Sequence, residues 1–200
     1  MSSCGCESGQ SETLERKALV ALLLINAVMF FVELLVGLFA ESTGLIADSL
    51  DMLADAGVYG LSLYAVGRGL QKQSSTARIS GMLQVSLSAF VLVEVLRRFV
   101  FGSEPESTLM MGIASVALDA NVYCLKILSR HRDAGIHMRA SWIFSTNDVI
   151  ANLGVIVSGA LVFVTGSRYP DLVVGAIISG VILRGGIQIL KEAHTAKAGA

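Results

Sequence analysis

Six long apolar stretches, separated by short polar breaks, take up most of this 200-residue chain. They cover residues 17–39, 44–68, 78–101, 108–128, 141–165 and 170–190. A helix needs about 20 apolar residues to cross the hydrocarbon core of a bilayer, and each stretch reaches that length. Only 16% of the residues are charged, whereas soluble domains average about 25%. The sequence therefore predicts an all-α membrane protein, integral and multi-pass, built as a six-transmembrane-helix bundle in the lipid bilayer.

The distribution of Lys and Arg predicts the orientation of the bundle. With the N-terminus in the cytoplasm, 12 of the 15 basic residues fall on the cytoplasmic side, and Arg97, Arg98 and Arg168 fall outside. Because basic residues concentrate in cytoplasmic segments, we expect the N- and C-termini to be cytoplasmic, in the cell (inner) membrane. We expect a flexible cytoplasmic N-terminal tail at residues 1–15, a six-helix transmembrane domain at 16–193 and a short C-terminal tail at 194–200.

The charge and the chemical motifs exclude several classes of protein. A net charge of −1 provides no basic surface for nucleic acid. An odd number of cysteines, three, does not form a disulfide framework. The chain has no recognisable pair of nucleophile and base, phosphate-binding glycine loop or HExxH motif. We therefore expect neither an enzyme nor a bound cofactor.

Carboxylates within the apolar stretches are the main functional signal. Each costs about 2.5–3.5 kcal/mol at the centre of a bilayer on insertion scales, so each requires a physical reason. Glu94 precedes Arg97 and Arg98 by one helical turn and is expected to pair with them. The complete set is Glu33, Asp48, Asp51, Asp55, Glu94, Asp119 and Asp148.

The second stretch carries three of these carboxylates on one helix face. Asp48, Asp51 and Asp55 fall within an arc of about 60° when each residue advances about 100°. Two anions one turn apart repel strongly away from water, so without a cation at least one keeps its proton. This pattern favours a cation site in which ion binding releases protons.

The fifth stretch supplies a matching polar stripe. Ser141, Ser145, Asp148 and Asn152 follow a 4-3-4 spacing, which places them along one face of a helix. Carboxylate, amide and hydroxyl oxygens are hard ligands that suit a divalent metal. We expect this stripe to face Asp51 and Asp55 near the middle of the membrane.

Two segments resemble the cation diffusion facilitator family. Asn26, Glu33 and Gly37, followed by residues 44–56, are similar to the first two spans of that family, and residues 147–152 are similar to its fifth span. The resemblance extends from Leu14 to about Ala193. It implies six helices with both ends inside the cell, and the transport of a divalent cation as substrate.

The resemblance also implies a ligand set. Asp51 and Asp55 match the second-span metal ligands and Asp148 matches the fifth-span aspartate, while Phe144 stands where the family usually has His or Asp. Because phenylalanine cannot bind a metal, either Asn152, Ser145 or water completes the shell, or the cargo has been changed or lost. Asp48 is interpreted as a second-sphere group that orients a ligand or relays protons.

The end of the chain departs from the family pattern. Family members usually end in a cytoplasmic ferredoxin-like domain that dimerises, whereas this chain stops about ten residues after its last span. The resemblance therefore implies a short member, and a homodimer formed through transmembrane helices, with the third and sixth as candidates. The sixth stretch contains Gly175, Ser179, Gly180, Gly185 and Gly186. Small residues allow close helix approach, and this pattern fits dimerisation and packing within one protomer equally.

Cys4 and Cys6 are weaker candidates on the cytoplasmic side. Two thiols one residue apart can collect a metal from the cytoplasm, but two ligands cannot close a structural zinc site. The alternative is a tail with incidental cysteines.

We interpret the sequence as a secondary transporter that exports a divalent transition metal of the zinc, cadmium, cobalt, iron and manganese class in exchange for protons. Oxygen ligands and Phe144 favour manganese, iron or cobalt slightly over zinc. The alternative is a non-transporting membrane scaffold or heterodimer partner that keeps the fold.

Overall fold

The regular structure of the described residues is entirely α-helical. The computed structural model describes residues 4–65, 70–129 and 136–198, except the side chains of 4–15, 62, 65, 70–74, 76–77, 136–145, 147, 192–193 and 195–198. The helices are α1 (Cys4–Phe39), α2 (Thr43–Ala65), α3 (Leu70–Phe101), α4 (Ser107–Ser129), α5 (Ile136–Thr165) and α6 (Tyr169–Ala198). Each apolar stretch forms one helix, which confirms the prediction of an all-α protein.

Five of the helices are long and apolar enough to cross a membrane. Their apolar segments are Arg16–Phe39, Arg78–Phe101, Ser107–Ser129, Asp148–Thr165 and Tyr169–Lys191. This finding supports a multi-pass integral membrane protein. α2 has the same length as α4, but its three aspartates interrupt the apolar run. The sixth span remains a prediction.

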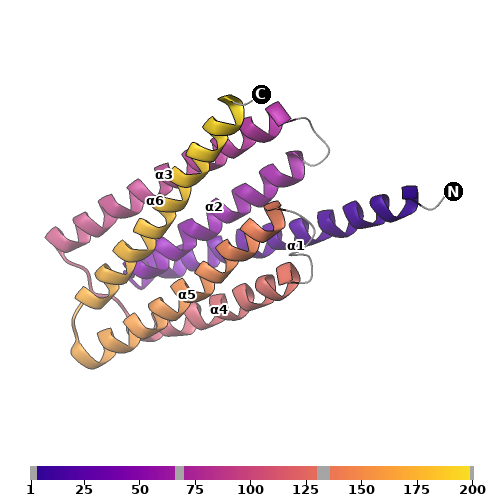
Figure 1. Cartoon of the computed structure of the whole chain (residues 1–200). Coiled ribbons are helices and arrows are strands. Elements are labelled where there is room, and N and C mark those ends of the chain that lie inside the picture. Colours follow the sequence, from indigo (N-terminus) through magenta and orange to yellow (C-terminus); the bar gives the residue numbers. More distant parts are fainter. Residues whose placement is uncertain (1–3, 66–69, 130–135, 199–200) are drawn as a thin grey trace.

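α2 lies in the middle of the bundle (Figure 1), packed against α1, α3, α5 and α6. Its Leu45, Ile46 and Leu50 belong to the main hydrophobic core. Large exposed apolar side chains lie mostly on the other five helices, and among the described side chains of α2 only Tyr64 is one of them. Because its neighbours shield α2 from the lipid, it can carry ionisable groups that an outer helix would expose to hydrocarbon.

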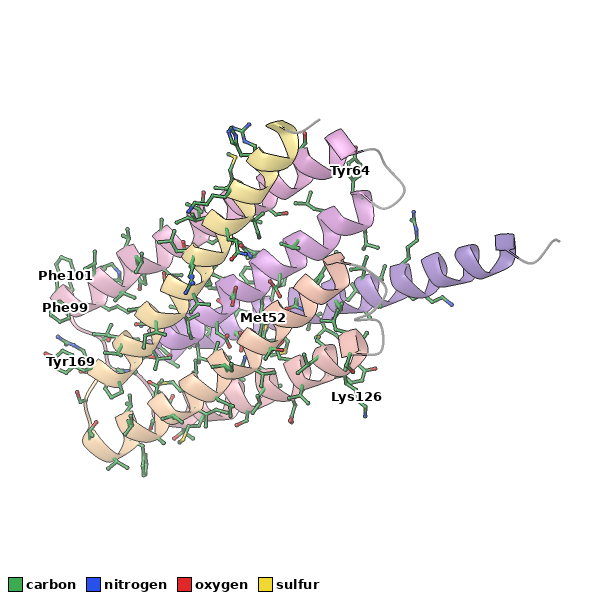
Figure 2. All side chains as sticks on the ribbon, viewed as in Figure 1. Met52, Tyr64, Phe99, Phe101, Lys126 and Tyr169 are labelled. Carbon is green, nitrogen blue, oxygen red and sulfur yellow. The ribbon has the colours of Figure 1, made fainter. Side chains whose placement is uncertain are left out.

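The helices run back and forth, so both chain ends lie at the end of the bundle where α2 and α4 finish (Figure 1). Tyr64 lies at this end, Phe99 and Tyr169 lie at the opposite end, and Met52 lies between them (Figure 2). The rings of Phe99 and Tyr169 are in contact, with centroids 6.4 Å apart. Aromatic side chains are typical of the membrane–water interface. Termini at one end agree with the expected topology, while the side of the membrane remains a prediction.

The outer helices extend further than the sequence suggests. α1 begins at Cys4 and α6 continues to Ala198, where the sequence predicts a flexible N-terminal tail at 1–15 and a C-terminal tail at 194–200. Neither extension contains a proline, and residues such as Glu7 and Glu12 have good helix propensity. Helix therefore continues into both predicted tails over the described residues, and the tails themselves remain predictions. The limits of the transmembrane domain, 16–193, remain a prediction.

Candidate functional site

The three aspartates of α2 point into the bundle. Asp48 is 1% exposed and Asp55 is 4% exposed, while Asp51 is half-buried. Met52, which follows Asp51, lies between the two ends of the bundle (Figure 2). The expected polar face of α2 is therefore enclosed by protein midway along the helix and does not face lipid.

α5 brings a fourth carboxyl group to this face. Asp148, 7% exposed, lies within hydrogen-bonding reach of Asp51 and also of Asp55. The structure therefore joins the three predicted ligands from two helices that are distant in sequence. α2 and α5 are in contact, and the carboxyl groups lie where these two helices meet.

Asn152 lies one turn after Asp148 and has an unused oxygen. Its side-chain amide nitrogen donates a hydrogen bond to the backbone oxygen of Asp148 at 2.7 Å. Its Oδ1 atom is buried and has no hydrogen-bond partner. A buried acceptor without a donor is costly, and a cation is one partner that would satisfy it.

The carboxyl groups meet in pairs and do not surround one point. Among the described residues, no three His, Cys, Asp or Glu side chains are arranged so that they could hold one metal ion. Asp148 nevertheless lies within hydrogen-bonding reach of Asp51 and of Asp55. Simultaneous coordination by all three therefore requires a small movement of the side chains or of the two helices.

Asp48 points to a different neighbour. Its carboxyl group lies within hydrogen-bonding reach of Glu33 on α1, and Glu33 is fully buried. Both Glu33 oxygens and Asp48 Oδ2 lack a conventional hydrogen-bond donor. Asp48 thus lies beside the Asp51, Asp55 and Asp148 group without joining it, and its second-sphere role remains a prediction.

Sequence reasoning missed Tyr59, which supports the site directly. Its hydroxyl donates a hydrogen bond to Asp55 Oδ2 at 3.4 Å, and its ring packs with Leu19 and Cys124. Tyr59 is 2% exposed. The spacing of four residues from Asp55 was the available signal, because positions i and i+4 share a helix face.

Several sequence candidates lie outside the described side chains: Cys4, Cys6, Ser141, Phe144 and Ser145. Ser145 as a ligand and the cysteine pair as a metal-collecting site therefore remain predictions.

Comparisons with known proteins match most of the chain to one family. Residues 19–195 match the family described as the cation efflux transmembrane domain. The chain is 26% identical over 195 residues to the zinc transporter ZitB of Yersinia pseudotuberculosis, covering 91% of this chain and 62% of that protein.

Two other relatives carry related names. The cadmium, cobalt and zinc/H(+)-K(+) antiporter of Bacillus velezensis is 22% identical, with 87% of this chain and 60% of the relative covered. The metal cation efflux system protein CzcD of Cupriavidus metallidurans is also 22% identical, with 89% and 62% covered. The chain thus spans about three fifths of the length of these curated relatives.

Proposed function

The chain belongs to the cation efflux family, and from this premise we propose that it exports a divalent transition-metal cation from the cytoplasm in exchange for protons. Asp51, Asp55 and Asp148 bind the ion, and Asn152 contributes its unpaired Oδ1. This family is one of transporters and not of enzymes. The metal is the substrate, and the proposal includes no cofactor.

The contact of Asp148 with both Asp51 and Asp55 carries the proposal. Among the described residues, the ion pairs of the structure all involve Glu94, so these three aspartates have no basic partner there. Negative charge held close together and away from water requires either protons or a cation. The same carboxyl groups can therefore exchange one for the other.

This exchange gives a transport cycle. A metal ion from the cytoplasm displaces protons from the aspartates, and the ion leaves on the outer side when protons return. The bundle opens alternately to each side, so that the site between α2 and α5 faces the cytoplasm and the outside in turn. Two of the relatives are named as transporters of zinc, cadmium or cobalt, which favours these metals as cargo. Oxygen ligands also accept iron or manganese.

The proposal includes the setting of the protein. With α2 as the sixth span both termini lie on one side of the membrane, and the distribution of Lys and Arg assigns that side to the cytoplasm. The inner membrane of the cell is the site of action. Two copies associate through transmembrane helices. Gly175 packs against Thr43 and Gly186 against Gln84 within one chain, whereas Gly180 lies on an exposed face of α6. The proposal places the dimer contact on the exposed faces of α3 and α6.

Purified protein in proteoliposomes tests the proposal. A panel of zinc, cadmium, cobalt, iron and manganese is applied under a pH gradient, with a metal dye and a pH dye read together. Metal movement coupled to opposite proton movement is expected, and Asp51→Asn vesicles should show neither. If wild-type vesicles show no flux for any metal, the proposal fails, and flux restored only by adding a second family member would support the heterodimer-partner alternative.

A further inference from the structure

Asp171 is a fully buried carboxylate that the proposed transport cycle does not use. It lies in the first turn of α6 and is 0% exposed. Its oxygens accept hydrogen bonds from the Ser42 hydroxyl at 2.7 Å and from the backbone amides of Thr43 and Gly44. All three donors belong to the start of α2, so the negative charge is satisfied by another helix.

These bonds complete the N-terminus of α2. The first amides of any helix lack partners within the helix. In α2, the amide of Leu45 donates to the Ser42 hydroxyl oxygen at 3.1 Å, and the amide of Ile46 donates to the Ser42 backbone oxygen at 3.2 Å. The amides of Thr43 and Gly44 have Asp171 as their acceptor. The helix dipole also favours a negative charge at this end.

The two helices are in close contact around this cap. A Cβ atom at Gly44 would lie 3.0 Å from Asp171 Oδ1, and one at Gly175 would lie 2.8 Å from Thr43 Cγ2. Both glycines therefore leave room that a larger side chain would fill. α6 is in turn bonded to α3, because the Ser179 hydroxyl donates to the backbone oxygen of Ser88 at 2.8 Å. The start of α2 is thus held against a supported helix.

The position of this end determines where the aspartates of α2 lie. Asp51 follows Thr43 by eight residues, about 12 Å along the helix axis. A slip of one residue would turn the side chains by about 100° and would carry Asp51 and Asp55 away from Asp148. Whatever fixes the height and rotation of α2 therefore also fixes the geometry of the site.

We propose that Asp171 is a positioning residue for metal binding: from α6 it caps α2 and so holds Asp51 and Asp55 opposite Asp148. This inference rests on the proposed function. Asp171 does not contact the ion, and its effect reaches the site through the backbone of α2.

Asp171→Asn is the first test, because the side-chain NH₂ group cannot accept from the α2 amides. With Cd²⁺ as the probe in proteoliposomes, KM should rise by about tenfold, the effect of leaving one buried donor unpaired, while the maximal rate per inserted protein stays near that of wild type. Glu106→Gln, which changes an exposed carboxylate just before α4, is the control and should leave KM unchanged. An unchanged KM in folded Asp171→Asn protein, or a loss confined to protein yield, would overturn the proposal.

A second variant covers the case in which Asp171→Asn does not fold. Gly44→Ala keeps every hydrogen-bonding group but presses on Asp171 Oδ1, so it should raise KM in the same direction, and an unchanged KM again contradicts the proposal. If wild-type vesicles move no metal, the proposed function fails separately. Amide hydrogen exchange in detergent then decides: faster exchange of Thr43 and Gly44 in Asp171→Asn supports the cap, and unchanged exchange refutes it.

Discussion

At the scale of single residues, the buried carboxylates of the bundle differ in what compensates their charge. Glu94 has two arginines on its own helix, bonded at 2.6–2.7 Å. Asp171 accepts hydrogen bonds from the backbone amides at the N-terminus of α2. Asp51, Asp55 and Asp148 lie close to one another, and among the described residues no basic side chain pairs with them. A carboxylate with a permanent partner stabilises structure, whereas a group without one can exchange protons for a cation.

Asp51→Asn and Asp148→Asn should each abolish metal transport, because an amide keeps the shape of the side chain but supplies no negative charge for the ion. Metal flux per amount of inserted protein is the measurement. Glu106→Gln, which alters an exposed carboxylate at the distal end of the bundle, is the control. Full flux in either aspartate variant would remove these residues from the site.

Tyr59→Phe should weaken metal binding by about two- to tenfold, which corresponds to the usual net free-energy contribution of one hydrogen bond. The hydroxyl fixes Asp55 Oδ2, and without it the carboxyl group must be ordered by the ion itself. Calorimetric titration with Cd²⁺ gives the affinity. Tyr64→Phe, at the exposed end of α2, should bind as wild type does, and equal affinities in all three proteins would contradict a role for Tyr59.

Phe144→His should strengthen zinc binding, because it restores a nitrogen ligand at the position where the family usually has His or Asp. Zn²⁺ titration of the purified variant against wild type is the check. An unchanged affinity would count against the alignment of the fifth span.

At the scale of elements, two of the small residues of α6 serve packing within one chain. Gly186 lies against Gly81 and Gln84 of α3, and Gly175 lies against Thr43 at the start of α2. Gly180 has no neighbouring side chain within 4 Å of the place a Cβ would occupy. The sequence offered dimerisation and internal packing as equal alternatives, and the structure assigns Gly175 and Gly186 to internal packing.

Gly186→Ala should destabilise the protein by about 1–3 kcal/mol, since overpacking forces neighbouring groups to shift. The new Cβ would lie 3.0 Å from Gln84 Cβ and 3.1 Å from the backbone oxygen of Gly81. Thermal unfolding in detergent measures the effect. Gly180→Ala adds the same methyl group where nothing is near and should unfold at the wild-type temperature or above it, so equal losses in the two variants would disprove the packing argument.

At the scale of the whole molecule, the number of spans determines where the termini lie. Five candidate spans are apolar by composition, and an odd number would place the two ends on opposite sides of the membrane. With α2 as a sixth span, both ends lie on one side. We propose α2 as that sixth span, because surrounding helices cover most of its surface and would shield its aspartates from lipid.

Reporters fused to the two ends should therefore both indicate the cytoplasm. A reporter active only in the periplasm and one fluorescent only in the cytoplasm, each placed at either terminus, are the measurement. Insertion of the same reporters after Ser103, between α3 and α4, should give the opposite result. Termini on opposite sides would exclude α2 as a span.

The sequence by itself determined the helices and the contacts within them. Apolar runs of sufficient length predicted all six, and spacings of three and four residues predicted the pairing of Glu94 with its arginines. They also predicted the shared face of Asp51 and Asp55. These features depend on neighbours along the chain, which a helical repeat places in advance.

Only the tertiary structure decided which helices meet. It brought Asp148 to Asp51 and Asp55, a meeting that the polar stripe of the fifth stretch and the family resemblance had predicted. It also joined Asp171 to the start of α2, for which no local pattern gave a signal. Such contacts join residues about 90 to 130 positions apart in the chain, and the repeat of a single helix carries no information about its distant neighbours.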